Sequence, residues 1–181
     1  GGIFKSYKLT PDIVTFGKAI GNGYALTAIV GKKKIMKSAE SSFISSTFWS
    51  ERIGFIAGLA TLNYMKKYKT WIKIKKTGEE IKKEWARLAD KYSLKIKIFG
   101  ISSIPQFVFL KNNSIYKTYI TQEMLKKNIL ASNIVYVSLA HSKPILKYYF
   151  LCLEKIFKDI STKKITKSSL KSKVAFNTFK R

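Results

Sequence analysis

The stretch PDIVTFGKAIGNGYALTAIVG, residues 11–31, decides the fold. Its Pro-Asp start is typical of a turn, and the apolar run that ends at Phe16 predicts a short buried strand. The GNG triplet at 21–23 predicts a tight turn, because glycine adopts backbone conformations that other residues avoid. A second short strand is expected over 27–31, and Lys18 lies between the first strand and the turn.

Lys18 is the residue of this stretch that is suited to chemistry. Burying a lysine is costly unless it is paired or used chemically, and α/β sheets place their ligands at the carboxyl ends of strands. A lysine withdrawn from water there exists partly as the neutral amine, which is the form that makes a Schiff base with an aldehyde. The alternative is an ordinary surface lysine, since the chain has 32 lysines and three arginines.

Two helices are predicted to follow. Residues 32–40 predict a brief basic helix or turn, and 41–49 a loop rich in hydroxyls. A longer helix is expected from Ser50, as its N-cap, and its predicted buried face consists of Ile53, Ile56, Ala57, Ala60, Tyr64 and Met65. A second helix is predicted over about 77–92, with an apolar stripe of Ile81, Trp85, Leu88, Ala89 and Tyr92.

The remainder of the chain alternates between strand and helix patterns. In order, we expect strands at 94–99 and 106–110, a helix at 121–130, a strand at 134–138 and a helix at 142–160. After Ser161 the chain is rich in Lys, Ser and Thr, which predicts a loose basic tail. The first third is therefore expected to be part of an α/β layer and the later part a smaller α+β unit, with a boundary near 66–76.

The composition excludes several classes of protein. Of the 181 residues, 46% are hydrophobic, which excludes wholesale disorder, and the sequence has neither an apolar run long enough to span a membrane nor a signal-peptide pattern. A single cysteine, Cys152, excludes an internal disulfide, and with a single histidine, His141, no Cys/His zinc site is possible. We therefore expect a cytoplasmic protein with no metal and no membrane partner.

The net charge of +25 leaves an alternative function open. A field of this size attracts nucleic acid or anionic surfaces, so the alternative is a basic α/β binding module without catalysis. However, the cations are lysines spread along the whole chain, whereas specific nucleic-acid recognition relies on arginine. We therefore expect no specific nucleic-acid partner.

Three blocks in order resemble the class III aminotransferases, which are pyridoxal-phosphate enzymes of fold type I, and in particular their glutamate-1-semialdehyde aminomutase-like branch. Residues 11–31 resemble the family's lysine segment, and ISSTFWSERIGFIAGLATL, from Ile44, resembles its Ser-Thr-Phe loop and the helix that follows. TQEMLKKNILASNIVYVSLAH, from Thr121, resembles its C-terminal block. Ala25 and Thr27 depart mildly from the family's usual proline and alanine.

The resemblance implies the site residues and the cofactor. Lys18 would form the Schiff base with pyridoxal 5'-phosphate and, when freed, would move a proton between the substrate and the cofactor. Thr47 would reach across a homodimer interface to the cofactor phosphate of the neighbouring subunit; without the family it is an ordinary loop threonine. The substrates would be an amino donor and a carbonyl acceptor, both small molecules.

The resemblance also implies the domain organisation. It covers only about the C-terminal half of a family member: residues 1–66 would complete the large cofactor-binding domain, 67–161 would form the small α+β C-terminal domain, and 162–181 a basic tail. The family's phosphate loop, stacking aromatic residue and ring-nitrogen aspartate would lie upstream, so we expect the chain by itself to be inactive. An incomplete sequence, a split gene and a decayed remnant remain open as explanations.

Overall fold

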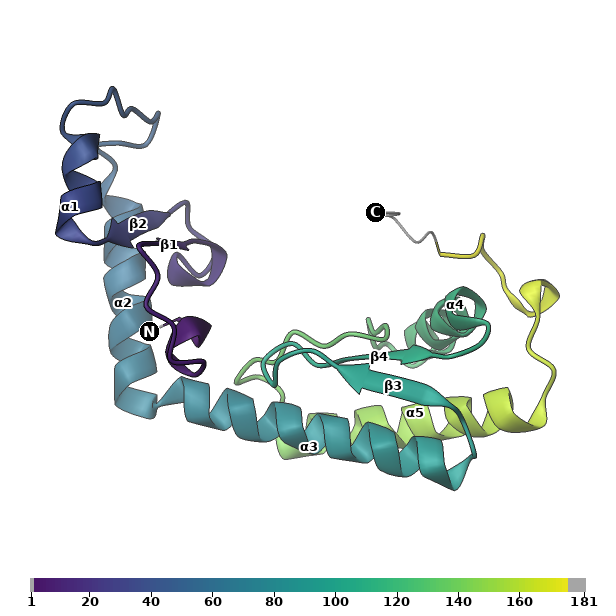
Figure 1. Ribbon diagram of the computed structural model, residues 1–181. Helices are drawn as coiled ribbons and strands as arrows, with labels where there is room; N and C mark the ends of the chain where they lie inside the picture. The colour runs from purple at the N-terminus through teal and green to yellow at the C-terminus, as the bar shows by residue number, and fades with distance from the viewer. Residues whose placement is uncertain (1, 176–181) are drawn as a thin grey trace. The chain divides into compact units, whose positions relative to one another are not determined.

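The computed structural model describes residues 2–175. The chain divides into two compact units, Gly1–Lys69 and Thr70–Arg181. Figure 1 colours the first unit from purple to blue and the second from blue to yellow. Each unit combines helices with a two-stranded antiparallel sheet.

The first unit is organised around two paired strands, β1 (Ile13–Phe16) and β2 (Ala28–Gly31). The register pairs Ile13 with Gly31 and Phe16 with Ala28, so the connection between the strands carries both Lys18 and the GNG turn. Both strands lie where the sequence predicts them. The helices of this unit are η1 (Ile3–Lys5), η2 (Lys18–Ile20), α1 (Lys33–Met36), η3 (Lys37–Ala39) and α2 (Arg52–Tyr68).

The prediction that β1 is buried is wrong for this chain. Its residues alternate between exposed and partly buried, and the side chain of Ile13 is 50% exposed. Of the described residues in this unit, only Gly21, Gly54 and Gly58 are buried. Two short strands and one long helix offer too little surface to cover each other, so the apolar side chains of this unit remain in contact with solvent.

The N-terminus of α2 also differs from the prediction. The helix begins at Arg52, and its N-cap is Glu51, whose side chain makes no capping hydrogen bond. Ser50 is therefore not the cap. At the other end, Lys69 has a left-handed backbone and its N–H donates to the carbonyl of Met65, which ends the helix.

The buried face of α2 is not the predicted apolar stripe. Ile53 and Ile56 are 52% and 64% exposed, whereas Gly54 and Gly58 are buried. Glycine lets another backbone approach the helix closely, so the glycines form the contact and the large apolar residues point away from it.

The second unit contains three long helices and one antiparallel strand pair (Figure 1). Its elements are α3 (Thr70–Lys91), β3 (Ile96–Phe99), β4 (Gln106–Phe109), α4 (Asn113–Leu125), α5 (Lys143–Thr162) and η4 (Lys167–Ser169). Helices α3 and α5 run side by side, α3 also contacts β3, and α4 contacts both β4 and α5. The two strands and the closing helix with Pro144 in its first turn were predicted and are confirmed.

The core of the second unit is aromatic at its centre. Trp85 of α3, Phe107 of β4 and Phe157 of α5 are fully buried, and Phe107 makes edge-on ring contacts with the other two. The indole N–H of Trp85 donates to the hydroxyl of Tyr149 at 3.0 Å, and burial raises the pKa of that hydroxyl. The predicted stripe of α3 is buried from Ile81 to Ala89, as expected, whereas its last predicted member, Tyr92, lies beyond the end of the helix and is only partly buried.

Three elements of this unit differ from the predictions. α3 begins at Thr70 rather than near 77, and α4 covers 113–125 rather than 121–130. The start of α4 is fixed by Asn113, whose side-chain oxygen accepts the backbone N–H of Phe109 at 3.0 Å. The predicted strand at 134–138 is only an isolated bridge between Ile134 and Gln106.

The segment after Ser161 is not a loose tail as far as residue 175. Ile165 is buried, and the backbone N–H of Lys171 donates to the side-chain oxygen of Gln122 at 2.6 Å. Farther on, the N–H of Ala175 donates to the hydroxyl of Thr118 at 2.9 Å. These bonds attach the segment to α4. The remainder of the predicted tail, 176–181, lies outside the described residues.

Candidate active site

Lys18 lies two residues beyond the end of β1, at the start of the short helix η2. Gly17 before it is extended, and Lys18 itself has a left-handed backbone with φ of 49°. A side chain crowds the backbone in this conformation, so neighbouring contacts must maintain it. The carbonyl of Lys18 accepts the N–H groups of Gly21 and Asn22 at 3.2 and 3.3 Å, which closes the turn.

The side chain of Lys18 is exposed in this chain. The expectation that Lys18 is withdrawn from water is therefore wrong, because none of the residues 2–175 forms a packed layer over the turn. Among these residues, the Lys18 amine makes no hydrogen bond or ion pair. The amine is consequently free to bond to a ligand.

Thr47 lies in the exposed loop that precedes α2. This loop is folded on itself, since Ser46 accepts the N–H of Phe48 on its hydroxyl at 3.3 Å and the N–H of Trp49 on its carbonyl at 3.2 Å. Within the described part of the chain, the Thr47 hydroxyl has no hydrogen-bond partner. Its oxygen is therefore available to a partner from outside this chain.

A hollow of about 560 Å³ joins the two segments that carry Lys18 and Thr47. Its lining comes from residues 25–27 of the β1–β2 connection, from the loop before α2 and from the first turn of α2; the residues are Ala25, Leu26, Thr27, Ser46, Phe48, Trp49, Glu51, Gly54 and Phe55. Neither Lys18 nor Thr47 lines it. The structure thus brings together the segments that carry these residues, but not their side chains.

The sequence analysis missed the glycines of α2 as part of this region. A Cβ at Gly54 would lie 2.5 Å from the carbonyl oxygen of Ala25, and one at Gly58 would lie 2.5 Å from Cδ2 of Leu26. The signal that could have identified them is the pair of glycines four residues apart in GFIAG, which lie on one face of a helix.

The residues present fit part of what pyridoxal phosphate requires. The free amine of Lys18 suits its aldehyde, and the free hydroxyl of Thr47 suits a phosphate oxygen. Asp12 does not supply the ring-nitrogen carboxylate, because it binds Lys32 at 2.6 Å and lies before the opposite end of β1, about 20 Å of extended chain from Lys18. The described residues could therefore provide the covalent bond and a phosphate contact, but Asp12 does not provide the contact with the ring nitrogen.

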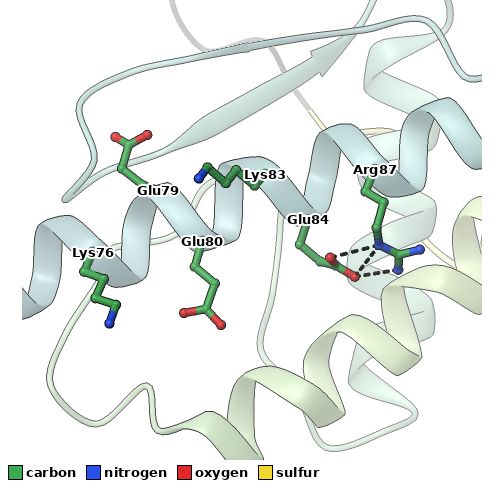
Figure 2. A pocket seen from close by; sticks show the side chains of 6 residues that line it. All are labelled: Lys76, Glu79, Glu80, Lys83, Glu84 and Arg87. Atoms are coloured by element: carbon green, nitrogen blue, oxygen red, sulfur yellow. Dashed lines mark hydrogen bonds and ion pairs between the residues drawn. The ribbon is translucent and has the colours of Figure 1, made fainter.

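A second hollow follows the solvent-facing side of α3 in the other unit. Figure 2 shows that its lining consists of charged side chains from this single helix: Lys76, Glu79, Glu80, Lys83, Glu84 and Arg87. Arg87 pairs with Glu84 at 2.5 Å, and the hydrogen bonds that the guanidinium donates to this carboxylate raise the pKa of Arg87. Alternating charges of this kind are typical of a solvated helix face, so we assign no site to it.

Two further features are absent from the described residues. None of their helices is both long and apolar enough to cross a membrane. Residues 2–175 also contain no group of three or more histidine, cysteine, aspartate or glutamate side chains that would hold a metal ion.

Comparison with known proteins identifies the family. The sequence profile of the class III aminotransferases matches residues 3–127, which include both Lys18 and Thr47. Two curated relatives are the 3-aminobutyryl-CoA aminotransferase of Cloacimonas acidaminovorans, 29% identical over 71% of this chain, and the glutamate-1-semialdehyde 2,1-aminomutase of Methanocaldococcus jannaschii, 31% identical over 70% of it. The chain covers 32% and 31% of their respective lengths.

The fold agrees with the family. The structure of the PLP internal aldimine form of the FumI protein of Sphingopyxis sp. MTA144 superposes with a TM-score of 0.79 at 18% identity. The match covers 90% of this chain and 41% of that one, so the α/β fold corresponds to part of a larger fold of that type. The chain belongs to the class III aminotransferase family.

Proposed function

We propose that the chain is the C-terminal portion of a pyridoxal-phosphate-dependent aminotransferase or aminomutase, and that Lys18 binds the cofactor covalently. The observation that supports this best is the free amine of Lys18 directly after β1, within the segment that the family profile matches. The chain covers about a third of the curated relatives described above, so the activity belongs to the complete protein.

Lys18 has two tasks in this proposal. Its Nζ would bond to the aldehyde carbon of the cofactor with release of water, and would so hold the cofactor beyond the end of β1. Once an amino donor had displaced it, the freed Nζ would accept the proton from the donor's α-carbon and return it to the former aldehyde carbon of the cofactor, so the same nitrogen would serve as base and as acid. The cofactor supplies the electron sink for this proton transfer.

The assignment of Lys18 is tested by borohydride reduction of the complete protein with pyridoxal phosphate, followed by peptide mapping. We expect the reduced label on Lys18, and we expect Lys18→Arg to abolish it. Lys32→Arg is the matched control, because it keeps the charge beside Asp12 and lies in the same unit. A label on another lysine, or an unchanged label in Lys18→Arg, would overturn the assignment.

Thr47 acts, in this proposal, on the phosphate bound to the other subunit of a homodimer. Its free hydroxyl, the exposed loop around it and the exposed side chain of Trp49 support a surface that another subunit covers. Hydroxyl and backbone N–H groups are common phosphate ligands, and each hydrogen bond to a charged oxygen is stronger than a neutral one.

Subunit mixing tests this arrangement. Lys18→Arg and Thr47→Ala homodimers should both be impaired, but a hybrid of the two has one site with both Lys18 and Thr47 intact. A 1:1 mixture that exchanges subunits should therefore recover about a quarter of the wild-type rate. Recovery that is absent although mass spectrometry detects hybrids would place Thr47 in the site of its own subunit.

The substrates we propose are a small amino donor and a small carbonyl acceptor, which the aminotransferase and aminomutase names of the two curated relatives support. Those relatives include both an aminotransferase and an aminomutase, so both reaction types are retained. We also propose a cytoplasmic location, supported by the single cysteine, Cys152, which is buried and free.

A further inference from the structure

Helix α2 presents two glycines where its contact with the rest of the first unit is closest. Gly54 and Gly58 lie four residues apart and therefore on one face of the helix. They are the only buried residues of α2, although glycine in a helix interior is less favourable than alanine. A specific contact must therefore account for them, and the contact is with the segment that follows Lys18.

The segment after Lys18 rests directly on these glycines. A Cβ at Gly54 would lie 2.5 Å from the carbonyl oxygen of Ala25, and a Cβ at Gly58 would lie 2.5 Å from Cδ2 of Leu26 and 3.8 Å from the carbonyl oxygen of Ile20. These partners follow Lys18 by two to eight residues. The helix thus contacts both the start and the end of the turn that begins at Lys18.

We propose that Gly54 and Gly58 form a seat that holds the turn after Lys18 and so positions the amine of Lys18. The proposal depends on the proposed function of Lys18. The backbone of Lys18 is left-handed, a conformation that a lysine retains only if neighbouring contacts maintain it. The turn's own hydrogen bonds, from Gly21 and Asn22 to the Lys18 carbonyl, are among those contacts, and the seat fixes the turn to the helix.

Replacing Gly54 with alanine is expected to disturb the turn more than replacing Gly58. At position 54 a methyl group meets a backbone oxygen, so the whole segment must move. At position 58 it meets the end of the flexible Leu26 side chain, which can rotate or be shortened. Gly58→Ala should therefore be the milder change, and Leu26→Ala should relieve it.

Hydrogen exchange in the complete protein without cofactor tests the seat independently of activity. In Gly54→Ala, we expect the amides of Gly21, Asn22 and Tyr24 to exchange about tenfold faster or more, because the turn leaves the helix. In Gly58→Ala, we expect an increase of about threefold or less, reversed in the Leu26→Ala double variant.

Cofactor trapping provides the second measurement. With pyridoxal phosphate and borohydride, Gly54→Ala should label Lys18 about tenfold more slowly than the wild type, with Gly58→Ala in between. Gly31→Ala is the matched control: its methyl group also meets a backbone oxygen, that of Asp12, at 2.6 Å, but at the end of the strand pair away from the turn. This control should leave both the exchange at the turn and the labelling of Lys18 unchanged.

The outcomes separate the seat from the proposed function. Unchanged exchange and labelling in Gly54→Ala would overturn the seat even if Lys18 carries the label. A wild-type label on another lysine would overturn the function, while exchange would still decide whether the glycines hold the turn. If Gly54→Ala does not fold, the proposal is tested by Gly58→Ala alone and together with Leu26→Ala. Faster exchange at the turn in Gly58→Ala that persists in the double variant would contradict the seat.

Discussion

Trp85 is a fully buried residue of the second unit that carries a polar group, its indole N–H. Its indole N–H and the hydroxyl of Tyr149 form a buried hydrogen bond of 3.0 Å, linking α3 to α5 across the aromatic core. Both groups are removed from water, so each depends on the other for its hydrogen bond. A polar pair of this kind fixes how the two helices face each other more strictly than apolar contacts do.

Replacing Trp85 with phenylalanine should lower the free energy of unfolding by about 2–4 kcal/mol. The loss combines the unsatisfied hydroxyl of Tyr149 with the space left by the smaller ring. Urea unfolding measures it. Tyr148→Phe is the control, because the Tyr148 hydroxyl, which donates to Lys127 at 3.3 Å, is exposed; its loss should stay below about 0.5 kcal/mol.

A Trp85→Phe variant as stable as the wild type would contradict the role of the pair. The double variant with Tyr149→Phe tests the explanation further. Removing the orphaned hydroxyl should restore part of the stability, because an apolar pair leaves no buried polar group unsatisfied. A double variant less stable than the sum of the two single ones would point to packing instead of the hydrogen bond.

At the scale of elements, the sequence predicts the buried face of α3 correctly and that of α2 wrongly, for a physical reason. The stripe of α3 faces residues of its own unit, so the helical spacing of Ile81, Trp85 and Leu88 correctly marks the buried side. Ile53 and Ile56, on the predicted face of α2, remain 52% and 64% exposed, and periodicity alone cannot reveal whether an apolar residue has a packing partner. The contact that does exist uses glycines, which hydrophobic periodicity ignores.

In the candidate site, too, the local features were predicted from the sequence and the long-range contact was not. The order strand, lysine, glycine turn, strand is local, and the sequence predicts it to within one residue for β1 and β2. The contact of the turn with Gly54 joins residues about thirty positions apart, and it depends on the shape of a helix face rather than on local propensity. Such contacts require the three-dimensional structure.

At the scale of the whole molecule, the hydrophobic core is unevenly distributed. The buried hydrophobic side chains of the described residues all lie between Ile81 and Ile165, within the second unit. In the first unit, by contrast, the described residues include large exposed side chains such as Phe43, which is 97% exposed, and Trp49. Burial of apolar surface drives folding, so the two units should differ in their ability to fold independently.

We expect a chain of residues 70–181 to fold by itself and one of residues 1–69 to remain without a cooperative fold. The second unit retains its aromatic core and the bond between Trp85 and Tyr149, whereas the first has only glycines buried among residues 2–69. Circular dichroism on heating should show a sigmoidal transition for 70–181 and a gradual, featureless change for 1–69. Matched concentrations and added glycerol control for aggregation. A cooperative transition in 1–69 would mean that its exposed apolar side chains cover one another in solution, and it would remove the reason for assigning them to a surface that another chain covers.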